Sequence, residues 1–156
     1  MYIMFVDLVR CHAGRRGRTV HTMPSVGVRY IVDDVDAAIA FYCDRLGFHE
    51  DMHPAPAFAM LSRGELRLAL SAPGGGPGGG GRAMPDGAVP TPGGWNRIQH
   101  QVDDLDATVA ALRDAGATFR NEIVEGVGVR QILVEDPAGN LVELFQPLRP
   151  EASLNG

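Results

Sequence analysis

The sequence predicts an α+β protein built from two tandem modules, each containing one strand, one helix and about three further strands. A repeated motif and the patterning around it support this fold class. The motif reads VDDVDA at residues 32–37 and VDDLDA at residues 102–107, an offset of 70 residues. In both copies the pattern changes from strand-like to helix-like at the motif. A repeat of this kind indicates two copies of one supersecondary unit.

Each copy begins with a strand that leads into a helix. Apolar residues alternate before each motif, which predicts a half-buried strand because neighbouring side chains on a strand point to opposite faces. An aspartate pair then precedes a helix whose apolar positions follow helical spacing. These positions are Val35, Ile39, Tyr42 and Leu46 in the first copy and Leu105, Val109 and Leu112 in the second. Gly47 and Gly116 are the expected ends of the two helices.

Both copies return to strand patterns after the helix. A turn signal interrupts each run, SRGE at residues 62–65 and DPAGN at residues 136–140, so each run is expected to be a hairpin. We therefore place the first βαβββ module at residues 23–73 and the second at residues 95–148. One helix cannot cover both faces of such a sheet, so one face of each module should stay open for a pocket or a partner. This uncovered surface predicts a homodimer.

Three segments lie outside the modules. Residues 1–22 carry four Arg and one Asp and are expected to form a disordered N-terminal extension. Met23 could be the natural start, or the segment could be a short regulatory arm. Residues 74–94 are rich in Gly and Pro and predict a mobile linker, not a phosphate-binding loop, because no Lys-Ser/Thr pair follows. Residues 149–156 are expected to be a C-terminal tail.

Composition limits the partners of the chain. With 156 residues, 45% of them hydrophobic, it has room for one domain or two half-size modules that share a core. The net charge of −5 argues against nucleic acid, and no apolar run is long enough to predict a membrane span. Cys11 and Cys43 form no paired motif, which fits a reduced cytoplasm. All 14 basic residues are Arg, which suggests a GC-rich bacterial coding sequence.

Two longer motifs resemble the vicinal oxygen chelate superfamily of glyoxalases, extradiol dioxygenases and bleomycin-resistance proteins. They are VDDVDAAIAFYCDRLGF at residues 32–48 and DPAGNLVELF at residues 136–145, and the resemblance spans residues 25–147. It implies that the paired modules form a cup-shaped mixed sheet that holds a small-molecule ligand. In the metalloenzyme members, a divalent metal at the floor of the cup chelates two oxygens of the substrate.

The resemblance also implies four metal-ligand positions, which this chain fills with Gly27, Ala69, Arg97 and Glu143. Only Glu143 can ligate a metal, since Gly and Ala have no donor and a guanidinium is a cation without a free lone pair. One carboxylate would hold a divalent ion only weakly, because catalytic sites usually have about three protein ligands. We therefore expect no cofactor and no tightly bound metal.

The histidines are not expected to replace the missing ligands. His100 is three residues from Arg97, so strand alternation points it to the opposite, helix-packed face unless a bulge intervenes. A buried structural role is expected for it. His49 and His53 flank the expected second strand, where exposed loop positions are the simplest interpretation.

Strand alternation from the ligand positions identifies the side chains of the open face. The candidate ligand-binding residues are Arg29, Arg67, Trp95, Arg97, Gln99, Glu143 and Phe145, with Trp95 near the rim. Three arginines against one carboxylate favour an anionic ligand held by guanidinium groups. If Glu143 satisfies Arg97 fully, the floor is neutral and an apolar or aromatic ligand is favoured instead.

Three functions remain open. The missing metal ligands favour a binding protein of the antibiotic-resistance type, because binding requires no activated water. The alternative is an enzyme, either a glyoxalase-like lyase or isomerase with Glu143 as general base and Arg97 holding an oxyanion, or a metal-dependent enzyme such as a dioxygenase whose ligand positions are aligned differently. In the third, the open face serves only assembly.

Overall fold

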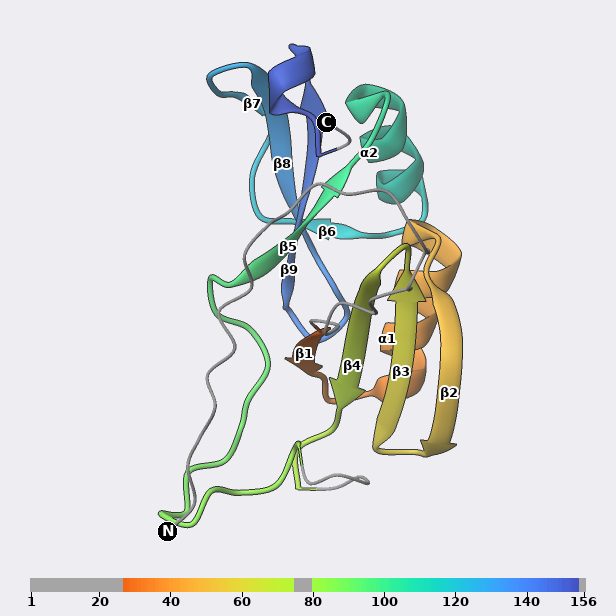
Figure 1. Ribbon diagram of the computed structural model, residues 1–156, viewed down its shortest axis with the longest axis vertical. Helices are drawn as coiled ribbons and strands as arrows, with labels where there is room; N and C mark the ends of the chain where they lie inside the picture. Colours follow the sequence, from red (N-terminus) through yellow and green to blue (C-terminus); the bar gives the residue numbers. More distant parts are fainter. Residues whose placement is uncertain (1–26, 75–79, 155–156) are drawn as a thin grey trace, which may run out of the picture.

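The computed structural model describes residues 27–74 and 80–154. It contains two mixed sheets, each accompanied by one helix, and this arrangement confirms the predicted α+β fold of paired modules (Figure 1). The expected N-terminal extension at residues 1–22 and part of the expected linker, residues 75–79, lie outside the described residues. No helix in the described part of the chain is long and apolar enough to cross a membrane.

The first module has one helix and four strands. They are β1 (Gly27–Ile31), α1 (Val35–Ala40), β2 (His49–Ala55), β3 (Phe58–Arg63) and β4 (Leu66–Ser71), and a π-helical turn, Phe41–Arg45, extends α1. The strand order is β1-β4-β3-β2. β1 runs parallel to β4, and the other pairs are antiparallel. The sheet therefore follows the βαβββ pattern expected from the sequence.

The second module repeats this topology with one change. Its elements are β5 (Arg97–Gln101), α2 (Leu105–Asp114), β6 (Thr118–Phe119), β7 (Val124–Glu125), β8 (Val129–Glu135) and β9 (Leu141–Pro147). The strand order is β5-β9-β8-β6, and β7 also pairs with β8. Two short strands thus occupy the place of β2, and a 3-10 turn, Pro150–Ala152, follows β9.

The repeated motif marks the start of both helices. The second aspartate of each copy is the N-cap: the Asp34 carboxylate accepts from the Ala37 N–H and the Asp104 carboxylate from the Ala107 N–H, each at 2.9 Å. This bond satisfies one of the free N–H groups in the first turn. The predicted helix ends are also confirmed, because Gly47 has a φ of 68° and adopts the left-handed conformation that follows many helices.

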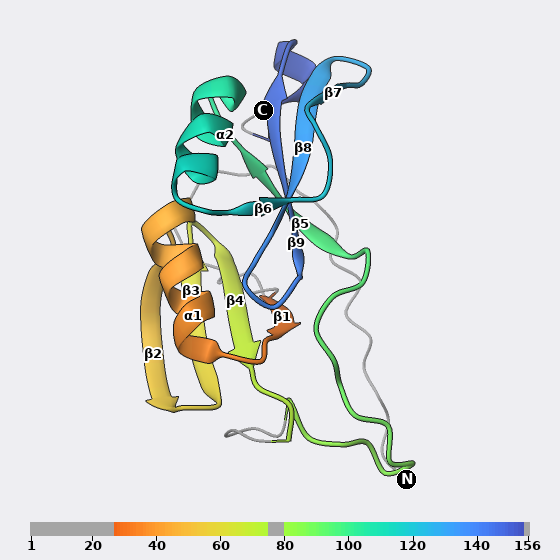
Figure 2. The ribbon, with the colours of Figure 1, turned by 180° about the vertical axis from the view of Figure 1, so that it is seen from behind.

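Both modules contribute to one hydrophobic core. It includes Tyr30, Tyr42 and Leu68 from the first module and Ile132 and Leu144 from the second, all buried. The two helices lie on the same side of the molecule (Figure 2). A core shared in this way makes each module depend on the other for burial of its apolar face.

Polar contacts from the β8–β9 turn also join the modules. The Tyr42 hydroxyl donates to Asp136 Oδ2 at 3.0 Å, and Asn140 Nδ2 donates to the carbonyl of Ile31 at 2.8 Å. Asn140 Oδ1 accepts from the N–H of Gly93 at 2.8 Å. Burial raises the pKa of Asp136 above its ordinary range, although three donors from its own turn oppose this effect. The DPAGN motif therefore helps to join the two halves.

The histidines of the first module differ from the prediction. His49 and His53 lie within β2 and not in loops. The His53 side chain is 23% exposed, and its buried Nε2 atom is 3.7 Å from Asp36 Oδ1, too far for a hydrogen bond. The expected second strand extends further than predicted, because its alternation is weak, with five of its seven residues polar or proline.

Candidate functional site

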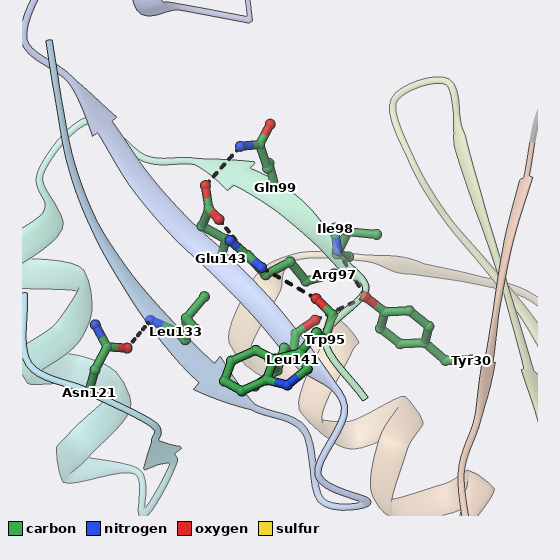
Figure 3. Close-up of polar contacts among 9 residues, drawn as sticks. All are labelled: Tyr30, Trp95, Arg97, Ile98, Gln99, Asn121, Leu133, Leu141 and Glu143. Atoms are coloured by element: carbon green, nitrogen blue, oxygen red, sulfur yellow. Dashed lines mark hydrogen bonds and ion pairs between the residues drawn. The ribbon is translucent and has the colours of Figure 1, made fainter. Parts of the chain in front are cut away.

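A buried carboxylate lies on the sheet of the second module, held by two side chains of the neighbouring strand. Arg97 Nε donates to Glu143 Oε2 at 2.7 Å, and Gln99 Nε2 donates to Glu143 Oε1 at 2.8 Å (Figure 3). The parallel register places Gln99 beside Glu143, and Arg97 precedes it on the same face. The Glu143 side chain is 5% exposed and that of Arg97 is 34% exposed. Each carboxylate oxygen therefore accepts a hydrogen bond from the protein.

Trp95 lies at the edge of this group. It is 68% exposed, and its carbonyl accepts from Arg97 Nη1 at 3.3 Å. The guanidinium of Arg120 lies 5.5 Å from the centre of the indole ring and is itself paired with Glu135. A shallow cavity of about 400 Å³ is lined by Trp95, Asn96, Arg97, Gln99 and Glu143. Its volume is within the range of small-molecule sites.

Tyr30 joins the first module to this site. In a regular parallel ladder the Ile98 N–H would donate to the Leu141 carbonyl, because Val102 donates to Phe145 in the same register. The Tyr30 hydroxyl stands between the two groups, accepting from Ile98 at 2.9 Å and donating to Leu141 at 2.9 Å (Figure 3). Burial is the main cause that raises the pKa of Tyr30 to about 12.

The other predicted arginines lie in the first module and have partners there. Arg29 donates to the Ser71 hydroxyl at 2.5 Å and lies 5.9 Å from the ring centre of Phe58. Arg67 lies 3.8 Å from a carboxylate oxygen of Asp51. Neither arginine lines the cavity at Trp95. Of the three arginines expected on one surface, only Arg97 is therefore part of this group.

Phe145 is placed differently from the other candidates. It lies opposite Gln101 in the register and is 4% exposed. It does not line the cavity at Trp95. Its role as a ligand contact stays a prediction.

The residues at the implied metal positions do not fit a divalent metal. Gly27 and Ala69 offer no side-chain donor, and Arg97 places a cation 2.7 Å from the carboxylate that would have to ligate the ion. Within residues 27–74 and 80–154, no group of three or more His, Cys, Asp and Glu side chains could hold a metal ion. Metal independence is thus an expectation from the donor set.

His100 lies on the face of β5 that strand alternation predicted. It shares that face with buried Ile98 and pairs in register with buried Leu144. The imidazole is partly buried. Burial, with a smaller contribution from Arg63, lowers the pKa of His100 to about 4. His100 therefore lies away from Arg97, on the other face of the strand.

Sequence reasoning missed two residues of this region, Tyr30 and Arg120. Tyr30 is one of the alternating apolar residues before the first motif, and the alternation predicts only that its side chain is buried. A buried tyrosine usually finds a partner for its hydroxyl, and this could have signalled a polar contact, but not its location. Nothing in the pattern around Arg120 indicated a contact with Trp95.

Comparisons with known proteins agree with this architecture. The family model of the Glyoxalase/Bleomycin resistance protein/Dioxygenase superfamily matches residues 18–144. A superfamily member from Sphaerobacter thermophilus has a similar structure, with a TM-score of 0.63 and 25% identity over 81% of this chain and 99% of its own. A search of curated proteins gave no match.

Two further solved structures share the fold at lower identity. A lactoylglutathione lyase from Agrobacterium tumefaciens has a TM-score of 0.59 and 22% identity over 82% of this chain and 96% of its own. TnmS3, an antibiotic binding protein from a Streptomyces species, has a TM-score of 0.60 and 22% identity over 82% of this chain and 98% of its own. At this level of identity the two likenesses concern the fold alone.

Proposed function

Because the chain belongs to the glyoxalase/bleomycin resistance protein/dioxygenase superfamily, we propose that it binds a small organic molecule in the cavity at Trp95. Arg97, Gln99 and Glu143 form the floor of this cavity. The observation that carries the proposal is the ion pair between Arg97 and Glu143, because it occupies two of the four implied metal positions with a guanidinium and its counter-ion. Such a floor suits binding without metal chemistry.

The charge of the floor favours a neutral ligand. Arg97 and Glu143 compensate each other at 2.7 Å, while Arg29 and Arg67 have partners in the first module. The anionic ligand expected from the sequence required three arginines on one surface. A neutral aromatic molecule instead can pack against the exposed indole of Trp95, next to the Arg97–Glu143 ion pair.

The test uses the fluorescence of Trp95, which is the only tryptophan of the chain. Benzamide, benzoate and benzamidine have similar shapes and differ in charge. The wild type is expected to bind benzamide most tightly. Arg97→Met leaves the Glu143 carboxylate unpaired and should tighten benzamidine about tenfold, and Glu143→Gln should tighten benzoate by a similar factor.

Arg113→Met is the matched control for the lost charge, because Arg113 lies on α2 and pairs with Glu122 away from the cavity. It should bind all three compounds as the wild type does. A wild type that prefers benzoate tenfold would restore the anionic interpretation. If both cavity variants bind all three compounds as the wild type does, the floor residues do not take part in binding.

Catalysis by Glu143 is the second candidate, because a buried carboxylate at the floor of a cavity can serve as a general base. Binding is favoured over it, since both oxygens of Glu143 already accept hydrogen bonds from Arg97 and Gln99. A base must lie within hydrogen-bond reach of the proton that it removes. Solvent deuterium exchange at the α-carbon of a small carbonyl compound, lost in Glu143→Gln, would favour the enzyme.

The assembly and location of the chain are part of the same proposal. The cavity is lined by the second module alone, and Trp95 at its rim is left 68% exposed. We propose that a second copy covers this face in a homodimer, and that the protein acts in the cytoplasm. Light scattering at micromolar concentration tests the assembly, and a monomeric mass would contradict it.

A further inference from the structure

A second cavity lies where the β3–β4 turn of the first module meets β5. Its volume is about 480 Å³. Polar side chains of Arg63, His100 and Gln101 line it together with apolar side chains of Phe48, Leu66 and Leu154. Only Gln99 lines both this cavity and the one at Trp95. Strand alternation also places Gln101 on the same face of β5 as Gln99, but Arg97, Glu143 and Trp95 do not line this cavity.

Arg63 supplies a fixed positive charge to this cavity. Its Nη1 donates to the carbonyls of Leu46, at 2.6 Å, and Gly47, at 3.1 Å, at the C-terminal end of the first helix. These bonds orient the guanidinium and leave Nε and Nη2 without a partner among the described residues. Within the same part of the chain Arg63 makes no ion pair, whereas Arg97, Arg113, Arg120 and Arg130 each have a carboxylate within 2.7 Å.

His100 is a second group in this cavity whose protonated form an anion would stabilise. Its ring nitrogens have no hydrogen-bond partner among the described residues, and Arg63 is the only charged side chain that lines the cavity. Leu144, which pairs in register with His100 on β9, and Leu154, which lines the same cavity, carry no charge. The imidazole is therefore held neutral by burial and by the neighbouring Arg63, which has no counter-ion in the described part of the chain.

We infer that this cavity binds a small aliphatic carboxylate. Its carboxylate accepts hydrogen bonds from Arg63 and from protonated His100, and its short apolar body packs against Phe48, Leu66 and Leu154. A carboxylate matches the guanidinium fork, and charge-assisted hydrogen bonds are the stronger ones. The Nε2 amide of Gln101 can add a donor to such a site, because among the described residues only its Oε1 is hydrogen-bonded, to Ser153 and the Leu154 N–H.

Proton NMR of the His100 ring tests the site directly. Isobutyrate, added to the full chain, should shift the His100 resonances and raise the His100 pKa from about 4, because the bound anion stabilises the imidazolium. Isobutyramide has the same shape without the charge and should do neither. Arg63→Gln should abolish the effect, and Arg113→Gln, which removes an arginine from α2, should leave it intact. His100→Gln identifies the resonances.

Calorimetry on the wild type and on His100→Gln tests the site even if Arg63→Gln does not fold. An anion that moves the His100 pKa from about 4 to about 6 tightens wild-type binding several-fold between pH 8 and pH 5, although part of the isobutyrate is itself protonated at pH 5. In His100→Gln the affinity should not rise above the wild-type pH 8 value anywhere in this range. Trp95 fluorescence should remain unchanged, which separates this site from the proposed function. Equal binding of isobutyramide, or a pH dependence that His100→Gln retains, would overturn the inference.

Discussion

At the scale of single residues, Tyr30 shows how one side chain can replace a backbone contact. Its hydroxyl satisfies the Ile98 N–H and the Leu141 carbonyl, two groups at the point where β5 and β9 begin to pair. Both groups are buried, so without the Tyr30 hydroxyl each would lose its hydrogen bond and could not replace it with one to water. A residue of the first module thus completes the sheet that carries the candidate site.

We predict that Tyr30→Phe lowers the free energy of unfolding by about 2 kcal/mol near pH 8, because it leaves two buried backbone groups unpaired. The difference from the wild type should shrink as the pH rises. The folded-state pKa of Tyr30, about 12, lies above the unfolded value of 10.0, so its stabilisation is complete below pH 10 and is lost as the pH passes 12. Urea unfolding at pH 8, 10 and 11 measures this. A variant as stable as the wild type at pH 8 would contradict it.

The candidate site was only partly predictable at this scale. The motif positions located Arg97 and Glu143 on neighbouring strands, and alternation added Gln99 to the same face, as the structure has them. The partners of Arg29 and Arg67 could not be derived. Arg29 contacts Ser71, 42 residues away in the sequence, and Arg67 lies near Asp51 on β2, a strand whose alternation is weak. Local periodicity gives the face of a side chain but not its partner.

At the scale of elements, the strongest predictions were those with a local physical cause. The two helices begin at Asp34 and Asp104 and end before Gly47 and Gly116, because capping and a left-handed glycine act within a few residues. Both hairpins form at the predicted turns. Local chemistry was sufficient to set these boundaries.

Elements that depend on distant contacts were less predictable. β6 and β7 are two residues each and exist because the long strand β8 offers edges to pair with. Similarly, the polar strand β2 is held by pairing with β3. Strand propensity is strongly dependent on such context. The same dependence explains why His49 and His53 were expected in loops.

At the scale of the whole molecule, the two modules form a single unit. Buried side chains from both sheets make one core. Tyr42 and Asp136, and Asn140 and Ile31, join the halves by hydrogen bonds. Neither half covers its apolar face alone, so the repeat seen in the sequence is not a pair of independent domains. We expect the chain to unfold in one cooperative transition.

Asn140 tests this unity, because its amide contacts three separate parts of the chain. Nδ2 donates to the Ile31 carbonyl and to Asp136, and Oδ1 accepts from the Gly93 N–H, with the residue 4% exposed. Asn140→Ala should lower the free energy of unfolding by about 3 kcal/mol, since several buried polar groups lose their partners. Asn121→Ala is the control: Asn121 Oδ1 accepts from the Leu133 N–H within the second module, and its loss should cost about 1 kcal/mol.

Hydrogen exchange resolved by segment then distinguishes one folding unit from two. If the modules unfold together, Asn140→Ala lowers the protection of β3 and β4 as much as that of β8 and β9, because all four strands exchange through the same global opening. The wild type should show equal free energies of opening in the two sheets for the same reason. A loss of protection confined to β8 and β9 would mean that the second module opens alone, so that the shared core does not couple the halves.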